Sequence, residues 1–187
     1  MNAMSRNRAI FAVVIALLLI VGMIIGFAYT QITPTEPPSI VSLLDVEQTP
    51  QYGSIDLKQS DEPATVAVTS AGGTVDISTF PKYDDLSAGT CSGFVRATPV
   101  LRLNTPSAGS NLNIYFVGSS GAALFVLTPS HDLYGCDQNA TKSDGTYLRV
   151  SFVDFSPGAY TIWVASPTQG GSVSGSLSVK TGNDWHP

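Results

Sequence analysis

The sequence has few charged residues and no cluster of basic ones. Lys, Arg, Asp and Glu make up 12% of the 187 residues, and the formal net charge is −5. A surface that binds nucleic acid gathers Lys and Arg on one face, yet after Arg8 the next positive residue is Lys58. We therefore expect no nucleic-acid partner. The small acidic excess is spread along the chain, so it indicates no cationic substrate.

The motifs of common catalytic and metal sites are also missing. There is no G-x-S-x-G, H-E-x-x-H, P-loop or C-x-x-C pattern. Only two histidines occur, His131 in a turn-like Pro-Ser-His-Asp stretch and His186 beside the C-terminus. Neither sits in a pattern typical of a catalytic triad, and they add too little to two distant cysteines for a zinc site. We predict a non-enzymatic protein with no catalytic residue, cofactor or metal.

Cysteine is scarce too, with only Cys91 and Cys136 present. An even number of cysteines outside the cytoplasm favours a disulfide. Such a bond would close a loop of about 45 residues and stabilise the fold by roughly 3–4 kcal/mol in the chain-entropy model. The alternative is a pair of buried free thiols.

What the chain does contain is a long apolar run, Ala9–Tyr29, without a charged residue. As a helix it would be about 31 Å long, enough to cross a bilayer. Arg6 and Arg8 precede it, and the positive-inside rule then leaves residues 1–8 in the cytoplasm. A signal peptide is the alternative, but its apolar region spans only about 7–15 residues. We predict a retained anchor in the cell (inner) membrane and a periplasmic or extracellular C-terminal domain.

Two glycines within this run are spaced for helix packing. Gly22 and Gly26 form a GxxxG pair, which lets a second membrane helix approach closely. Glycine is common in membrane helices, so the pair could equally face lipid. We predict a contact at these two glycines with other transmembrane subunits.

Residues 30–63 are predicted to be a connector. The proline-rich stretch 33–38 cannot hold a helix and should run extended, at about 3.1 Å per residue. An apolar segment follows, and such a segment usually docks on its own domain or on a neighbouring subunit. The tail 182–187 contains a Trp with no evident core to enter. The predicted docking residues are Ile40, Val41, Leu43, Leu44, Val46 and Trp185.

From residue 64 to 181 the chain reads as short strands separated by turns. Apolar and β-branched stretches recur at roughly 8–12-residue spacing without a helical pattern between them. This spacing predicts an all-β fold, an antiparallel β-sandwich of jelly-roll type. We expect a hairpin turn at Gly72-Gly73. The expected strands cover 65–68, 74–77, 94–97, 100–103, 112–117, 123–127, 147–153, 160–164 and 173–179.

The second half of the chain shows a family resemblance. Its motifs are Cys91-Ser92-Gly93-Phe94-Val95, Leu112–Val117, Leu124–Pro129, Tyr134–Asp137 and Pro157–Val164. Their order resembles the pre-peptidase C-terminal family of extracytoplasmic β-sandwiches, over roughly residues 91–180. The resemblance implies an accessory domain without catalysis of its own, and it supports pairing Cys91 with Cys136.

The chain departs from that family in one respect. Relatives often carry an acidic cluster after the second cysteine, where carboxylates can hold a hard cation such as Ca²⁺. Here only Asp137 stands at that place, with Asp132 and Asp144 nearby in sequence. We expect these acids to be solvated and to bind no Ca²⁺.

Two functional hypotheses follow. In the first, the protein is a single-pass accessory subunit of a larger membrane complex, an electron-transfer or photosynthetic assembly being among the candidates. In the second, it is an independent membrane-anchored module that binds cell-envelope polysaccharide or protein. Aromatic residues such as Tyr115 and Tyr160 could form a sugar-stacking face, but strand alternation turns several of them inward. Trp163 in particular is expected in the core between the sheets.

Overall fold

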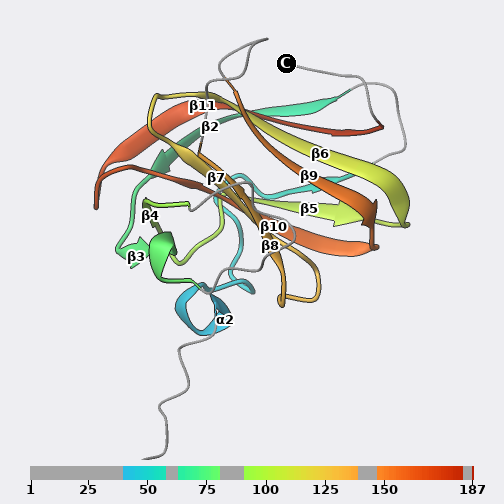
Figure 1. The fold of residues 1–187 in the computed structure, drawn as a ribbon, viewed down its shortest axis with the longest axis horizontal. Coiled ribbons are helices and arrows are strands. Elements are labelled where there is room, and N and C mark those ends of the chain that lie inside the picture. The colour runs from blue at the N-terminus through green and yellow to red at the C-terminus, as the bar shows by residue number, and fades with distance from the viewer. Residues whose placement is uncertain (1–39, 58–62, 81–90, 139–146, 183–186) are drawn as a thin grey trace, which may run out of the picture. The chain divides into compact units, whose positions relative to one another are not determined.

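The computed structural model describes residues 40–57, 63–80, 91–138, 147–182 and 187. Nearly all regular structure in these ranges is β, and most of it forms two stacked sheets, with a small two-stranded sheet beside them (Figure 1). The all-β sandwich predicted from the sequence is therefore confirmed. Within the described ranges, no helix has the length and hydropathy that crossing a bilayer requires. The predicted anchor at 9–29 with Gly22 and Gly26, the stretch 33–38 and Trp185 lie outside the described residues.

One sheet has four strands in the order β2-β11-β6-β9, and every neighbouring pair is antiparallel. The register places Leu177 of β11 opposite Val66 on one side and Phe116 on the other. The edges of this sheet are thus β2 and β9. The strands are β2 (Ala64–Ala71), β11 (Ser172–Thr181), β6 (Gly109–Gly118) and β9 (Leu148–Phe155).

The other sheet has five strands in the order β1-β5-β10-β7-β8. Only β1 is parallel to its neighbour. Without β1, the two sheets hold eight strands whose order is that of a jelly roll, as predicted. The strands are β1 (Ser54–Asp56), β5 (Leu101–Thr105), β10 (Gly158–Ala165), β7 (Ala123–Leu127) and β8 (Tyr134–Asp137).

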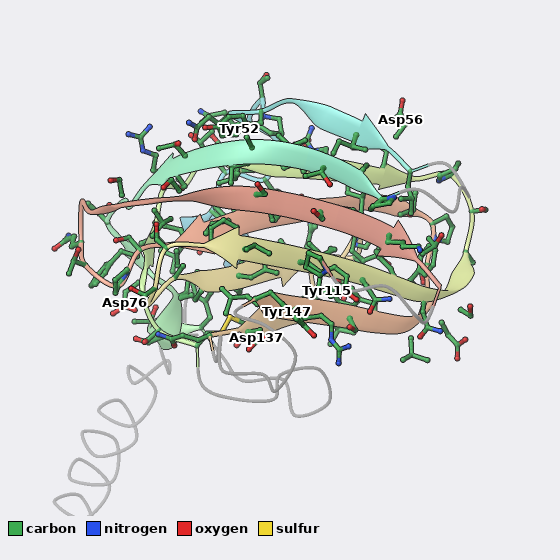
Figure 2. All side chains as sticks on the ribbon, turned by 90° about the horizontal axis from the view of Figure 1, so that it is seen from above. Tyr52, Asp56, Asp76, Tyr115, Asp137 and Tyr147 are labelled. Carbon is green, nitrogen blue, oxygen red and sulfur yellow. A yellow bond between two sulfur atoms is a disulfide. The ribbon has the colours of Figure 1, made fainter. Side chains whose placement is uncertain are left out.

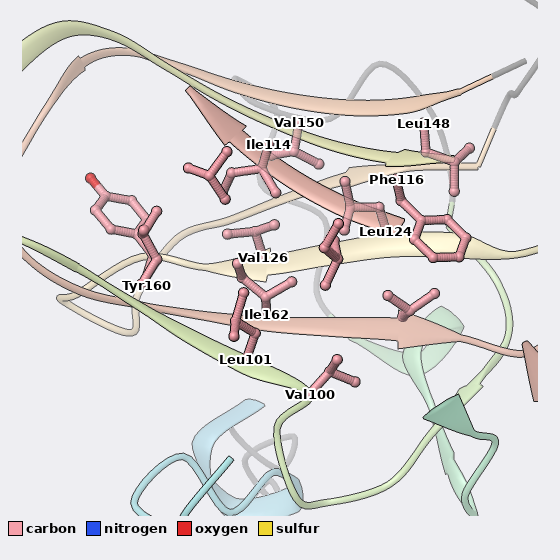
Figure 3. Close-up of a cluster of buried hydrophobic side chains, with 14 of the residues drawn as sticks. Val100, Leu101, Ile114, Phe116, Leu124, Val126, Leu148, Val150, Tyr160 and Ile162 are labelled. Atoms are coloured by element: carbon pink, nitrogen blue, oxygen red, sulfur yellow. The ribbon is translucent and has the colours of Figure 1, made fainter. Parts of the chain in front are cut away.

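The core between the sheets follows from strand alternation. In β9, Leu148, Val150 and Phe152 are buried, whereas Arg149 and Val153 are exposed, because successive side chains of a strand point to opposite faces. The buried side chains of the four-stranded sheet point at the inner face of the five-stranded sheet (Figure 3). Facing residues in this cluster include Ile114, Phe116, Leu148 and Val150 from one sheet and Leu101, Val126, Tyr160 and Ile162 from the other.

The five-stranded sheet is buried on its outer face as well. Phe125, Leu127 and Trp163 point away from the four-stranded sheet into a second cluster. Short elements cover this face, and the cluster takes Ile77 and Val95 from them. These elements are α2 (Ile40–Leu43), β3 (Val75–Asp76), the 3₁₀ turn η1 (Ile77–Thr79) and β4 (Phe94–Val95).

Trp163 therefore lies on a different side of the sheet from the one predicted. It is buried, but its ring packs on Phe125 of the outer cluster, with ring centroids 5.8 Å apart. β10 is covered on both faces, so all of Tyr160–Ala165 is buried and the strand shows no alternation of buried and exposed residues. The expectation of a core position between the sheets was wrong, because such a run does not say which face is inside.

The predicted hairpin at Gly72-Gly73 is also wrong. β2 pairs with β11, and β3 pairs with β4. The two glycines instead allow close packing, since a Cβ on Gly73 would clash with the carbonyl oxygen of Val95. Two glycines between β-branched stretches indicate a tight backbone contact as readily as a turn.

The domain also begins earlier than residue 64. β1, within the predicted connector 30–63, pairs with β5 through Ser54–Asp56, and Leu57 is buried in the main core. The compact unit that holds the sandwich starts at Pro38. β1 is too short to show an alternating pattern, so the sequence does not identify it as a strand. The predicted connector 30–63 therefore includes a strand of the sandwich.

Candidate binding groove at the end of the sandwich

The predicted docking segment lies partly on its own domain. Leu44 and Val46 are buried in the outer cluster against the five-stranded sheet. Leu43 remains 36% exposed. The side chains of Ile40 and Val41 lie outside the described part of the chain. Of the two docking alternatives, the structure thus shows contact with the domain itself for Leu44 and Val46.

Hydrogen bonds fix this segment further. The Arg102 guanidinium donates to the carbonyl oxygens of Val46 and Gln48, the latter at 3.3 Å. The Asp45 N–H donates to the Ala97 carbonyl at 3.0 Å. Tyr52 reaches β2 in the other sheet, and its position beside β1 is visible in Figure 2. The segment is therefore an integral part of the sandwich.

The structure contains the predicted disulfide between Cys91 and Cys136. Cys136 is buried in β8, within the outer cluster, and Cys91 packs against that cluster. Asp137 follows in β8, and its carboxylate accepts the N–H of Arg149 in β9 at 2.8 Å. Figure 2 shows Asp137 on the side of the molecule where Tyr115 and Tyr147 lie. The carboxylate thus connects the edges of the two sheets.

One end of the sandwich carries a groove of about 420 Å³, which we call the end groove. It lies between the β7–β8 turn and the β9–β10 turn. Its apolar residues outnumber its polar ones, as is typical of ligand pockets. The lining consists of Thr128, Pro129, Ser130, Leu133, Phe152, Val153, Asp154, Phe155, Ser156, Pro157 and Tyr160.

The β7–β8 turn forms the first wall. Thr128 closes the turn, because its N–H and its hydroxyl both donate to the Leu133 carbonyl, at 3.0 and 2.9 Å. His131 has a φ of 63°, in the left-handed region. The Ser130 hydroxyl donates to the Asp132 carboxylate. These bonds hold the wall in one conformation and present Leu133 at its rim.

The β9–β10 turn forms the second wall and touches the first. Asp154, near the end of β9 and just before this turn, also lies in the left-handed region, with a φ of 51°. The Thr105 hydroxyl donates to the carbonyls of Ser156 and Gly158, at 3.2 and 3.0 Å. A Cβ on Gly158 would come within 2.6 Å of Pro129 Cβ, so only glycine allows the two walls to meet here. The groove is preformed.

Exposed apolar side chains concentrate at this groove. Among the described residues, the large apolar side chains that remain exposed are Leu43, Val117, Leu133 and Val153. Leu133 is 39% exposed and Val153 71% exposed, and both line the end groove. Leu43 lines a second, shallower groove of about 390 Å³ beside Asp45 and Glu47.

The aromatic rings of the end groove are buried. Phe152 and Tyr160 pack against each other with ring centroids 5.2 Å apart, and Phe155 is also buried. Sugar binding by stacking needs an accessible ring face, and these rings offer little. The side chain of the lining that is charged at neutral pH is Asp154, with Asp132 next to the rim. The groove therefore suits an apolar group accompanied by a positive charge.

Tyr160 makes the groove floor sensitive to high pH. Burial raises the pKa of its phenol above the usual 10.0, and its hydroxyl donates a hydrogen bond to the Ser156 carbonyl at 3.1 Å. The folded state then holds this proton more tightly than the unfolded state. The contribution of Tyr160 to the free energy of unfolding is therefore fully present below pH 10. It is lost as the pH rises through the folded-state pKa of this phenol.

We expect Tyr160→Phe to remove this alkaline loss. The variant should lose about 1 kcal/mol at pH 7, because one hydrogen bond is missing. Its unfolding free energy should then depend less on pH above 10 than that of the wild type. Urea titrations at pH 7 and above pH 10 measure both effects. If the unfolding free energies of the two proteins depended equally on pH above 10, the alkaline loss could not be assigned to Tyr160.

The described residues contain no group of three or more His, Cys, Asp or Glu side chains placed to hold a metal ion. Asp137 and Asp132 accept the hydrogen bonds given above, and Asp144 and His186 lie outside the described residues. Of the groove residues, only Tyr160 was considered for binding from the sequence, as one aromatic of a possible sugar-stacking face, and none was predicted as a site residue. The first wall is a turn, and the second combines the end of β9 with the turn that follows it. Turn residues resemble ordinary loops until the fold brings them together.

The groove and its two-sheet scaffold define a β-sandwich with a preformed, largely apolar pocket. No known protein-family profile matches the sequence, and no curated protein matches it significantly. Solved structures with a similar fold include the pre-peptidase C-terminal domain of a collagenase from Bacillus anthracis. It shares 15% identity and a TM-score of 0.40, over 71% of this chain and 96% of that one.

Two further structures are similar. A periplasmic inhibitor of g-type lysozyme, PliG from Aeromonas hydrophila, has 14% identity and a TM-score of 0.39, over 68% of this chain and 94% of that one. A carbohydrate-binding module of a Cellvibrio mixtus lichenase has 17% identity and a TM-score of 0.29, over 62% and 98%. The first of the three structures is a pre-peptidase C-terminal domain, the family that the sequence resembles. At these identities the similarities concern the fold alone.

Proposed function

We propose that this protein is a non-catalytic accessory subunit, anchored in the membrane by residues 9–29, whose sandwich binds a partner protein through the end groove. The observation that carries the proposal is the exposure of Leu133 and Val153 within one preformed groove. Single exposed apolar residues are ordinary, but a concave group of them is typical of a contact site. The anchor places the groove on the extracytoplasmic side.

The chemistry of the groove specifies the partner segment. The lining carries the Asp154 carboxylate, and no Lys or Arg is among the lining residues. A complementary segment presents an apolar side chain for Leu133 and Val153 and a Lys or Arg beside it. Because the rings of Phe152 and Tyr160 are buried, the groove favours protein over polysaccharide.

The position of the described domain in the chain supports a partner at the membrane. Ten residues, 30–39, separate the apolar run from the first described residue. Ten residues reach at most about 36 Å when fully extended. The segment from Leu44 onward is held on the sheet by buried side chains and hydrogen bonds. A short tether and a fixed attachment favour a subunit of a membrane complex over a module that reaches far into the envelope.

The proposal predicts a loss of assembly when the groove becomes charged. In native membranes extracted with mild detergent, we expect the full-length chain to migrate within a larger complex. The double variant Leu133→Asp/Val153→Asp should migrate as the free chain. The two added carboxylates beside Asp154 would lose their hydration if an apolar segment packed against them. We expect at least about a hundredfold weaker association, since each buried charge without a partner costs several kcal/mol.

Val117→Asp provides a matched control. Val117 is 40% exposed on β6 and does not line either groove, so its substitution should leave the complex intact. Thermal unfolding of each purified variant shows whether the fold survives. If the wild type migrates alone, or if Val117→Asp releases the chain as fully as the groove variant, the proposal fails.

A further inference from the structure

The edge strands of the two sheets are protected unequally. An edge exposes unpaired N–H and C=O groups, and natural proteins protect edges with short strands, charges or proline. β1 has only three residues and ends in Asp56. β8 has four and carries the disulfide, while β9 carries Arg149 and Asp154. β2, with the sequence ATVAVTSA, has eight residues and neither charge nor proline.

Hydrogen bonds of Thr69 show which groups of β2 face its open edge. The Thr69 N–H donates to the Tyr52 hydroxyl at 2.6 Å, and the Thr69 carbonyl accepts from that hydroxyl at 2.9 Å. Tyr52 lies on the side of β2 away from β11. In an antiparallel ladder, alternate residues direct both backbone groups to the same side. Thr65 and Ala67 therefore also direct their N–H and C=O to the open edge.

The open stretch is closed at both of its ends. At Thr69, Tyr52 occupies both backbone groups and the Gln51 amide donates to the carbonyl at 3.0 Å. At the other end stands Pro63, which has no N–H to donate. Between them, the edge-facing groups of Thr65 and Ala67 have no backbone partner within the described part of the chain.

We propose that two copies of this chain pair through this stretch, with their β2 strands antiparallel and centred on Val66. In this register Thr65 faces Ala67 of the second copy, and by symmetry Ala67 faces Thr65 of the second copy. Both residues then exchange N–H···O=C bonds, which satisfies every open group in the stretch. At each end, Pro63 faces the Thr69 that Tyr52 has already capped. The stretch is therefore self-complementary.

The side chains agree with this pairing. On the outer face, exposed Thr65 lies beside the small exposed Ala67 of the second copy, and no charges oppose each other. On the inner face, Val66 is only partly buried in one chain and packs against the main core. Pairing brings two Val66 side chains together at the two-fold axis and buries them further. The inference does not depend on the end groove.

Cysteine crosslinking of the full-length chain in detergent tests the register. Thr65→Cys and Ala67→Cys are made separately, and the chain has no other free cysteine because Cys91 and Cys136 are bonded. Facing residues lie about 5.5 Å apart, within disulfide range, whereas like residues are offset by two positions and exceed the roughly 7 Å limit. We expect at least about tenfold more disulfide dimer in the mixture than with either variant alone.

Ser174→Cys is the matched control, because Ser174 is exposed on the same face but on β11. It should not crosslink. The proposal is overturned if the mixture gives no more dimer than the single variants or the control. Efficient crosslinking of Ala67→Cys with itself would equally overturn it, since that result places Ala67 at the centre of a different register. Loss of the groove-dependent complex would leave this result unchanged, so the two proposals can fail separately.

Discussion

A fragment that begins at residue 64 is expected not to fold, whereas a fragment of residues 38–187 is expected to fold cooperatively. The shorter fragment lacks β1 and three buried side chains, Leu44, Val46 and Leu57. Burying each of these contributes about 2 kcal/mol, so their loss costs roughly 6 kcal/mol. A domain of this size has about 5–15 kcal/mol in total. The deletion therefore removes a large part of the stability.

The loss extends to the polar contacts of the same segment. Without it, Arg102 loses its carbonyl acceptors, and β5 becomes an uncovered edge. Near-UV circular dichroism and urea unfolding of the two fragments measure the effect. The variant Leu44→Ala/Val46→Ala in the longer fragment is an intermediate control and should still fold with a lower urea midpoint. If the fragment that begins at residue 64 had the same urea midpoint as the fragment 38–187, residues 38–63 would not belong to the folded domain.

Removing the disulfide should have the second largest effect on stability. The bond closes a sequence separation of 45 residues, which corresponds to about 4 kcal/mol in the chain-entropy model. It also fixes the segment at Cys91 to β8, next to the outer cluster. We expect Cys91→Ala/Cys136→Ala to unfold at a much lower urea concentration, with a free energy lower by about that amount.

Alanine is a better replacement than serine, because Cys136 is buried and a serine hydroxyl there would need a hydrogen-bond partner. Wild-type protein unfolded in the presence of a reductant should show the same loss as the variant. A difference below about 1 kcal/mol would show that the bond contributes little, contrary to the loop-closure estimate.

Local patterns in the sequence predicted the fold well where one face of a strand is buried. In β9, apolar residues alternate with Arg149 and Ser151, and the strand lies where that alternation places it. Gly121 and Gly158 lie between the predicted strands, and both have positive φ, which favours glycine. The count and spacing of such strands were enough to predict a sandwich of jelly-roll type.

Prediction failed where tertiary contacts decide. Gly73 adopts its position because the backbone at Val95 approaches it, and Val95 is 22 positions further along the chain. Trp163 lies on the outer face because short segments cover that face, which its own strand cannot reveal. The end groove joins Leu133 from the β7–β8 turn and Val153 from the end of β9. No local pattern marks such a pairing, so the groove could be found only in the folded chain.

The most direct test of the proposed function is site-specific photo-crosslinking in native membranes. A photoreactive residue at position 153 of the full-length chain faces the end groove, whereas the same residue at position 117 lies outside both grooves. We predict one adduct from position 153, larger than this chain by the mass of a different protein, and its loss when Leu133 is also replaced by Asp. No adduct from position 153, or the same adduct from position 117, would contradict a partner-binding role for the groove.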